Sequence, residues 1–333
     1  MQVPAAVYDG GVVNAAYHEV LAKSITRRAG TTDPWFLGRY GMNLYRGCEH
    51  GCLYCDGRAE RYHVAGDFAR DIQVKRNAPA LLAQELAGRR EPGFVLLGGG
   101  VSDSYQPAEA RFGLARGVLE VCLAQGLPVH VLTKSALVER DLDLLAAINA
   151  RARAILSFSI ATVDEALRAR FEPGAAPIAT RFALIARAKA RGLAAGVMGM
   201  PLLPGLADQP AQVAALVQQA REAGADFVCL GGLTLRPGVQ AETYRAALAE
   251  AHPDLVPGYD RLYRAAARSG APEPRYLDRL EARGAAARRA ADLPGRVPWP
   301  IFRGLLPLVG GAGGGPTMSR TPEAGCCASC SSC

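Results

Sequence analysis

The feature that most constrains the fold is a regular alternation of apolar runs and amphipathic segments along residues 94–250. The apolar runs are short, as strands covered on both faces are, and they span 94–98, 129–133, 154–160, 194–200 and 227–235. Segments of helical period separate them, at 109–125, 136–150, 163–171, 177–191, 210–222 and 240–250. This alternation predicts βαβ units and a parallel sheet in an α/β fold. Periodicity alone leaves a barrel and a doubly wound sheet open.

Three cysteines lie within eight residues, directly after a short strand predicted at 42–47 and ahead of a helix predicted at 78–90. Cys48, Cys52 and Cys55 have the spacing C-x3-C-x2-C. A structural zinc site closes with four protein ligands, and an ordinary ferredoxin cubane uses four cysteines. The triad therefore indicates a cluster with one open corner, where a small molecule binds. The alternative is a zinc knuckle in which His50 or a distant thiol is the fourth ligand.

The cysteine loop resembles the radical S-adenosylmethionine (SAM) superfamily, whose pattern is C-x3-C-x-aromatic-C, with Tyr54 in the aromatic position. The longer string 42–52, Met-Asn-Leu-Tyr-Arg-Gly-Cys-Glu-His-Gly-Cys, is similar to the spore photoproduct lyase-like, or DNA repair photolyase-like, branch. Further likeness to that branch lies at 158–164, 171–177 and 201–208. The resemblance thus covers about residues 40–300.

The resemblance implies a partial (β/α)6 TIM-type barrel with the thiols at the carboxyl ends of its strands, where such barrels keep their active sites. It implies a [4Fe–4S] cluster on Cys48, Cys52 and Cys55, with SAM on the fourth iron. One electron, from a donor such as flavodoxin or ferredoxin, would cleave SAM to a 5′-deoxyadenosyl radical that abstracts hydrogen from a substrate. The protein then supplies placement and exclusion of solvent.

Residues at the other strand ends are the expected SAM contacts. The resemblance places a glycine-rich segment after the second strand against the amino end of SAM, and Gly98, Gly99 and Gly100 match it. Tyr54 is expected near the adenine. Polar candidates are Ser102, Asp103, Lys134, Ser157 and Ser159. The plainer interpretation is that glycines serve turns, strand-end serines cap helices and Lys134 is solvated.

One position departs from the branch. Spore photoproduct lyases carry a hydrogen-donating cysteine after the second strand, and the corresponding residue here is Gly100. The thymine-dimer reaction is therefore in doubt, and no catalytic residue is assigned. Tyr105 is a conceivable donor, although a tyrosine near a strand end is more often a packing residue.

The chain is expected to divide into an N-terminal extension (1–41), a radical SAM core (42–252), a helical C-terminal cap (253–303) and a glycine-rich linker with a cysteine-rich tail (304–333). The tail carries four thiols, at Cys326, Cys327, Cys330 and Cys333. They fit an auxiliary Fe–S cluster or another soft metal, a redox arm, or an incidental tail.

Composition restricts the function without selecting a substrate. The residues 1–20 lack a signal-peptide pattern, no apolar run reaches membrane-spanning length, and seven of nine cysteines cluster at two sites. These features predict a cytoplasmic protein with metal or redox chemistry. The formal charge of +7 is compatible with a nucleic acid partner. Alternatives are radical modification of a peptide or protein, and a non-catalytic metal- or nucleic-acid-binding protein. Cys122 and Cys229 are expected to be core residues.

Overall fold

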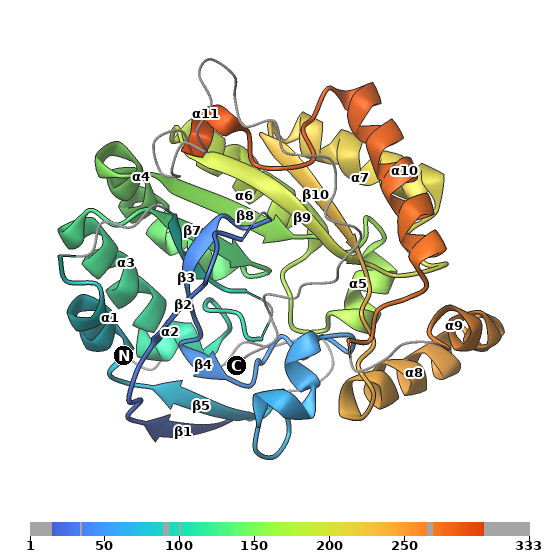
Figure 1. Cartoon of the computed structure of the whole chain (residues 1–333), viewed down its shortest axis with the longest axis horizontal. Helices are drawn as coiled ribbons and strands as arrows, with labels where there is room; N and C mark the ends of the chain where they lie inside the picture. The colour runs from blue at the N-terminus through green and yellow to red at the C-terminus, as the bar shows by residue number, and fades with distance from the viewer. Residues whose placement is uncertain (1–14, 34, 89–92, 100, 265–268, 303–333) are drawn as a thin grey trace.

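The fold is built on a central sheet of parallel strands. A computed structural model describes residues 15–33, 35–88, 93–99, 101–264 and 269–302. Within these ranges, six parallel strands lie side by side in chain order (Figure 1). They are β3 (Gly38–Met42), β6 (Phe94–Leu97), β7 (Val129–Thr133), β8 (Ala154–Ser159), β9 (Ala194–Leu202) and β10 (Phe227–Gly232). A doubly wound sheet would reverse its strand order at a switch point. The α/β prediction of a partial TIM-type barrel is therefore confirmed.

Helices connect successive strands and cover the outside of the sheet (Figure 1). The first group is α1 (Ala78–Glu85), α2 (Ala108–Phe112), α3 (Leu114–Gln125), α4 (Leu142–Arg151), α5 (Glu165–Phe171), α6 (Ile178–Ala190) and α7 (Pro210–Glu222). The later helices are α8 (Val239–Ala251), α9 (Val256–Leu262), α10 (Pro274–Ala291) and α11 (Trp299–Phe302). Short 3-10 helices span Asp56–Arg58, Glu60–Tyr62, Ala136–Asp141 and Pro253–Leu255. None of the helices in the described ranges is long and apolar enough to cross a bilayer.

The start of the barrel differs from its prediction. The first barrel strand is Gly38–Met42, not 42–47, because Tyr45–Arg46 (β4) turns away to pair with β5 (Asp71–Lys75). Sequence patterns hid this strand, since Gly38 and Gly41 interrupt its apolar run. Gly38 lies so close to β6 that a Cβ there would be 3.3 Å from Leu96 Cβ.

The segment 15–37, in which no regular structure was predicted, contains two more strands. β1 (Ala16–Val20) pairs in parallel with β5 and completes a small sheet of order β1-β5-β4. β2 (Thr26–Arg28) is antiparallel to β3 and ends the large sheet opposite β10. These strands are short and mostly exposed or half-buried, so they lack the apolar runs by which strands are detected.

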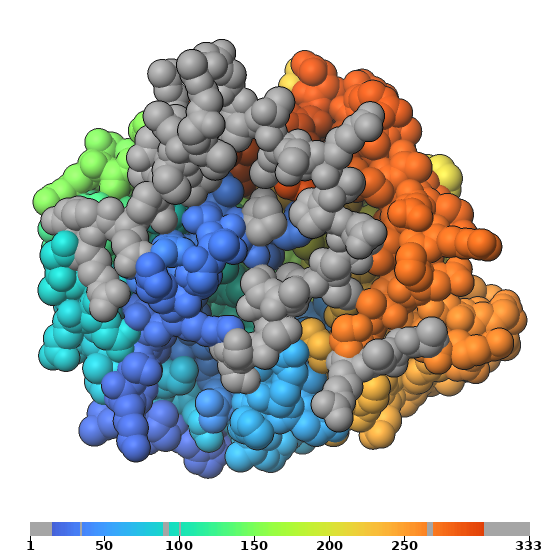
Figure 2. Space-filling view, in the orientation of Figure 1, coloured from blue at the N-terminus to red at the C-terminus, as the bar shows by residue number. Residues whose placement is uncertain are grey.

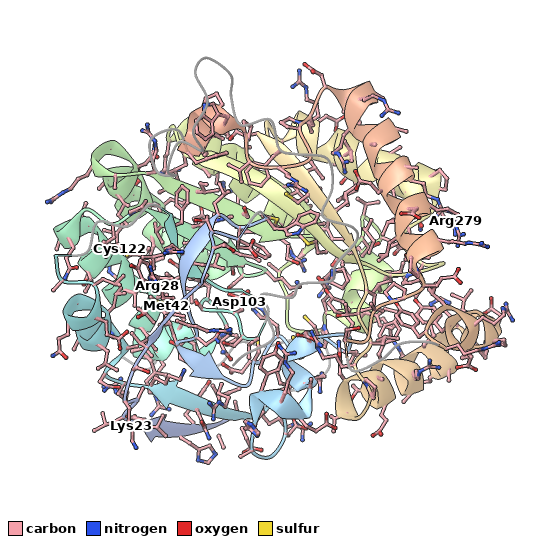
Figure 3. All side chains as sticks on the ribbon, in the orientation of Figure 1. Lys23, Arg28, Met42, Asp103, Cys122 and Arg279 are labelled. Carbon is pink, nitrogen blue, oxygen red and sulfur yellow. The ribbon has the colours of Figure 1, made fainter. Side chains whose placement is uncertain are left out.

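The predicted helices are largely correct, with two changes. The helix expected at 109–125 is divided at Gly113, whose φ of 64° is left-handed and ends α2 before α3 begins. The helix expected at 136–150 begins as a 3-10 helix, with Ser135 accepting a hydrogen bond from Leu137 N. The main core lies between the sheet and its helices. Cys122 and Cys229 are both fully buried in apolar surroundings, as predicted (Figure 3 labels Cys122).

Gly98 offers a test of how closely β6 and β7 must approach. Its φ is +81°, and a Cβ there would lie 2.1 Å from Leu132 O. We expect Gly98→Ala to lower the free energy of unfolding by more than about 3 kcal/mol, because conformational strain and a backbone clash add. Gly88→Ala is the matched control, since Gly88 has a φ of +71° with open space around it. It should cost about 1–2 kcal/mol in urea unfolding, and equal losses would contradict the clash.

Candidate metal and cofactor site

The three cysteines of the loop line one cavity of about 970 Å³, and their part of this cavity lies at the carboxyl ends of the parallel strands. Gly98 after β6, Thr133 at the end of β7 and Ser159 at the end of β8 are in the same wall. In Figure 2 the blue N-terminal segment and the orange C-terminal helices lie on opposite sides of the face in view. The cavity thus lies where parallel α/β folds place their active sites.

Backbone contacts fix the shape of the cysteine loop. Cys48 N donates to Phe68 O at 2.8 Å, and Leu53 N donates to Phe171 O at 2.9 Å. Gly174 N donates to His50 O at 2.9 Å, and a Cβ at Gly174 would lie 2.5 Å from Glu49 O. The segment 171–174 is therefore packed directly on the loop and tolerates no side chain at Gly174.

Two buried or half-buried side chains bracket the same loop. The Gln106 amide accepts from Glu49 N at 2.9 Å and donates to Gly47 O at 3.1 Å. The Arg58 guanidinium donates to Gly51 O and Cys52 O, both at 2.9 Å, and stacks over the Phe68 ring. Each cysteine is thus held on a backbone whose carbonyls have fixed partners.

Three thiols are the ligands of a soft metal centre, and a cubane binds each thiolate through a different iron. Among the described residues, no group of three His, Cys, Asp or Glu side chains surrounds a single metal position. Burial raises the pKa of Cys52 to about 12 and also raises the pKa of Cys48 and Cys55. The binding of a metal centre by these thiols must therefore release protons.

Asp103 is a hub that joins two strand ends to the cysteine loop (Figure 3). Its carboxylate accepts from Thr133 Oγ1 at 2.8 Å, Lys134 N at 2.7 Å and Tyr105 N at 2.8 Å, and it lies 3.3 Å from His50 Nδ1. Burial opposes ionisation, yet His50 and the two backbone N–H groups hold the pKa of Asp103 below its ordinary value. The carboxylate thus braces the site, and a direct contact with SAM stays a prediction.

Glu172 organises a second group of buried charges under the cavity. It pairs with Arg181 at 2.6 Å and accepts a short hydrogen bond from the Tyr54 hydroxyl. Lys134 Nζ lies 3.9 Å from the same carboxylate, donates to Ser159 Oγ and sits 5.8 Å from the centre of the Tyr54 ring. Burial raises the pKa of Glu172, but the cations and hydrogen bonds outweigh it and hold that pKa low. Tyr54 and Lys134 are therefore oriented by one carboxylate.

The remaining predicted residues divide into those at the cavity and those elsewhere. Cavity-lining residues include Tyr54, Gly98, Gly99, Ser102, Asp103, Lys134 and Ser159. Ser157 is not in the lining; its Oγ hydrogen-bonds His130 Nε2 at 2.8 Å inside the barrel. Gly100 and the tail cysteines Cys326, Cys327, Cys330 and Cys333 lie outside the described residues.

Sequence reasoning missed several residues that shape the site. Glu172 and Gly174 belong to a segment that resembles the branch, but nothing in the local pattern gave their partners. Arg181 and Gln106 are polar residues in or beside helices, a position that usually means solvent. Both are fully buried, and only the tertiary structure shows it.

The buried Glu172–Arg181 pair gives a stability prediction. Glu172→Gln keeps the volume but leaves the buried Arg181 charge without its counter-charge, so we expect a loss of about 3 kcal/mol in urea unfolding. Asp143→Asn breaks the exposed Arg191–Asp143 pair, and it should cost less than about 1 kcal/mol.

The pH dependence of this loss has a definite sign. Because the pKa of Glu172 is lowered on folding, its contribution is complete above its ordinary pKa of about 4 and is lost as the pH falls through the folded value. The variant should lose less stability than the wild type over that acid range. Equal acid sensitivity, or equal losses in the two variants, would contradict this assignment.

Comparison with known proteins agrees with this geometry. The model of the Radical SAM superfamily matches residues 42–217. An uncharacterized protein of Mycobacterium tuberculosis (strain ATCC 25618 / H37Rv) is 37% identical over 269 residues, which cover 79% of this chain and 76% of that protein. An uncharacterized protein of Acidianus two-tailed virus is 30% identical over 176 residues, covering 50% of this chain and 56% of its own.

The solved structures with a similar fold include two of spore photoproduct lyase. A mutant with bound AdoMet and dinucleoside spore photoproduct superposes with a TM-score of 0.64 at 16% identity, over 84% of this chain and 80% of that chain. The lyase complexed with dinucleoside spore photoproduct gives a TM-score of 0.62 at 15% identity, with the same coverage. The family match, the three loop cysteines and the partial barrel lead to one conclusion. This chain is an enzyme of the radical SAM superfamily.

Proposed function

We propose that this protein holds a [4Fe–4S] cluster on Cys48, Cys52 and Cys55 and cleaves SAM reductively to start hydrogen abstraction from a substrate in the cavity. The observation that carries the proposal is that all three thiols of the family motif lie in the wall of one cavity at the strand ends. When bound, the cluster supplies the electron that breaks the carbon–sulfur bond of SAM. A small donor such as flavodoxin or ferredoxin would reduce it.

The protein's own residues position SAM and exclude water. The backbone at Gly98 and Gly99 can meet the methionine end of SAM because neither residue has a side chain. Lys134, held by Ser159 and Glu172, offers a cation to the SAM carboxylate. Tyr54 and the adjacent backbone of the cysteine loop form the part of the cavity wall against which the adenine of SAM would lie.

Both of the candidate substrates are macromolecules. Nucleic acid is the first candidate, supported by the net charge of +7 and by the dinucleoside spore photoproduct in the similar structures. Polypeptide is the second, and a specific observation favours it: the cavity wall carries charges of both signs, with Asp278 and Glu281 beside Arg288 on α10, which suits the mixed charges of a polypeptide. A protein that keeps the fold for metal or nucleic acid binding alone would not cleave SAM.

Replacing the three loop cysteines tests the proposal. The variant Cys48→Ala/Cys52→Ala/Cys55→Ala should lose nearly all iron and all 5′-deoxyadenosine formation after anaerobic reconstitution with strong reductant, because each thiolate holds one iron. Cys122→Ala is the control, since that thiol is buried in the apolar core. Full iron loading in the triple variant would assign the cluster to other cysteines.

Deleting residues 310–333 tests the four C-terminal thiols separately. We expect SAM cleavage to continue, because the loop cysteines and the cavity lie within the remaining chain. If the tail binds an auxiliary Fe–S cluster, iron per chain should fall by that cluster's share. A redox arm would leave iron unchanged and slow turnover of the true substrate. Loss of SAM cleavage on truncation would contradict an active site complete without the tail.

A further inference from the structure

The three loop thiols lie in unlike electrostatic surroundings, although all three line the same cavity. Burial is the largest cause that raises the pKa of Cys48, and the negative charge of Asp103 is the next. At Cys52 and Cys55, burial again raises the pKa, but the largest charge effect comes from Lys134, which lowers it. The cavity is therefore more negative at the first cysteine of the loop than at the other two.

The geometry around Asp103 holds a charge in place beside the cysteine loop. Its side chain is 9% exposed, and its carboxylate lies 3.3 Å from Nδ1 of His50, a loop residue whose side chain is 3% exposed. The other donors to the carboxylate are uncharged: Thr133 Oγ1 at 2.8 Å, Lys134 N at 2.7 Å and Tyr105 N at 2.8 Å. The loop therefore faces a carboxylate that cannot move away from it.

The other acidic side chains near the thiols are compensated by strong cations. Glu172 pairs with Arg181 at 2.6 Å, and Asp56, which follows the third cysteine of the loop, pairs with Arg236. Asp103 forms no such pair with a lysine or arginine in the part of the chain that the structure describes. Of these three carboxylates, Asp103 is thus the one whose charge is least offset.

A buried charge of this kind acts on the reduction potential of a cluster. Reduction adds one electron, so the cluster becomes more negative by one charge while no bond is made or broken. A nearby anion opposes this change and a nearby cation favours it, and both effects are stronger in a buried site than in water. A cluster beside an uncompensated carboxylate is therefore harder to reduce, and once reduced it is a stronger electron donor.

We propose that the Asp103 carboxylate keeps the reduction potential of the cluster low, and that Lys134 acts in the opposite direction. The proposal rests on the proposed function for the presence of a [4Fe–4S] cluster on the three loop thiols. It gives Asp103 an electrostatic role in addition to its bracing contacts. The strength of the reductant that SAM cleavage requires is then set in part by one side chain.

A potentiometric titration of the reconstituted full-length protein tests the charge. Titanium(III) citrate supplies the electrons, and the EPR signal of the reduced cluster is followed without SAM, so that contacts of Asp103 with SAM do not enter. Asp103→Asn should make reduction about tenfold more favourable, which raises the midpoint potential by about 59 mV for one electron. The variant keeps the backbone N–H of residue 103 that hydrogen-bonds the Cys48 thiol. Removing a negative charge raises the potential in either proton state of His50.

Lys134 gives a test with the opposite sign. Lys134→Gln removes a cation near Cys52 and Cys55, so the midpoint potential should fall by a similar amount. Lys134→Arg keeps the charge and should stay close to the wild type. A general loosening of the loop would not move the potential in opposite directions in the Asp103 and Lys134 variants.

Two controls separate charge from bracing. Thr133→Val removes an uncharged hydrogen bond to the same carboxylate, so it should shift the potential by less than about half as much. Asp226→Asn should leave the potential unchanged, because Asp226 accepts from Ala195 N at the amino end of β9, the end of the barrel opposite the thiols. A shift in Thr133→Val as large as that in Asp103→Asn, or an unchanged or lower potential in Asp103→Asn, would refute the proposal.

Asp103→Ser is a second neutral variant, to be measured if Asp103→Asn does not retain a cluster, and it should raise the potential in the same way. Loss of the cluster in both variants would make Asp103 a purely structural residue and would end the proposal.

The outcome is separable from that of the proposed function. Wild-type protein that holds the cluster and forms 5′-deoxyadenosine, together with an unchanged potential in Asp103→Asn, would leave the proposed function standing and remove this inference. Wild-type protein that binds no cluster on the loop thiols would remove both.

Discussion

The cavity depends on the buried ion pair between Glu172 and Arg181. Arg181 also donates to Ser159 O and Ala176 O, both at 2.8 Å, so one guanidinium ties the end of β8 to the segment that follows α5. Glu172 in turn orients Tyr54 of the cysteine loop and lies beside Lys134, which directly follows β7. An isolated charge of either sign would be too costly to bury here. The pair therefore fixes three separate elements against one another only while both partners are present.

Close backbone packing also holds the elements around the cavity together, without any charged group. At Gly174 and Gly98 the neighbouring carbonyl oxygens leave no room for a Cβ, so the segments approach more closely than side chains would allow. These contacts place the loop cysteines and the β6–β7 strand ends around one space. The sequential winding of the sheet leaves it open between β10 and β2, and α10 packs beside β10 at that side. A large cavity that reaches both the thiols and α10 is the consequence.

The amino-acid sequence predicted what repeats along the chain and missed what depends on distant partners. The strands β7 and β9 and the helix α7 have strong local patterns, and their predicted positions agree closely with the structure. β3 was misplaced because Gly38 and Gly41 interrupt its apolar pattern, and Gly38 is required by packing on Leu96, a residue far along the chain. In the site, the cysteine spacing is local and was recognised. Arg181 and Gln106 became site residues only through burial, which no local pattern records.

Ser157 and Asp103 were both predicted to contact SAM because each is a polar residue at or after a strand end. Asp103 lies in the cavity wall, whereas Ser157 does not. Ser157 and Ser159 are two residues apart on β8 and face the same side of the strand, but Ser157 hydrogen-bonds His130 inside the barrel while Ser159, at the strand end, lines the cavity. The net charge of the chain likewise does not predict which charges line the cavity. A chain of charge +7 can still present carboxylates at its cavity, because the helical period of α10 turns Arg275 and Arg279 outward while Asp278 and Glu281 lie in the cavity wall beside Arg288. The arrangement of charge around the site, rather than its sum over the chain, decides which substrate can approach.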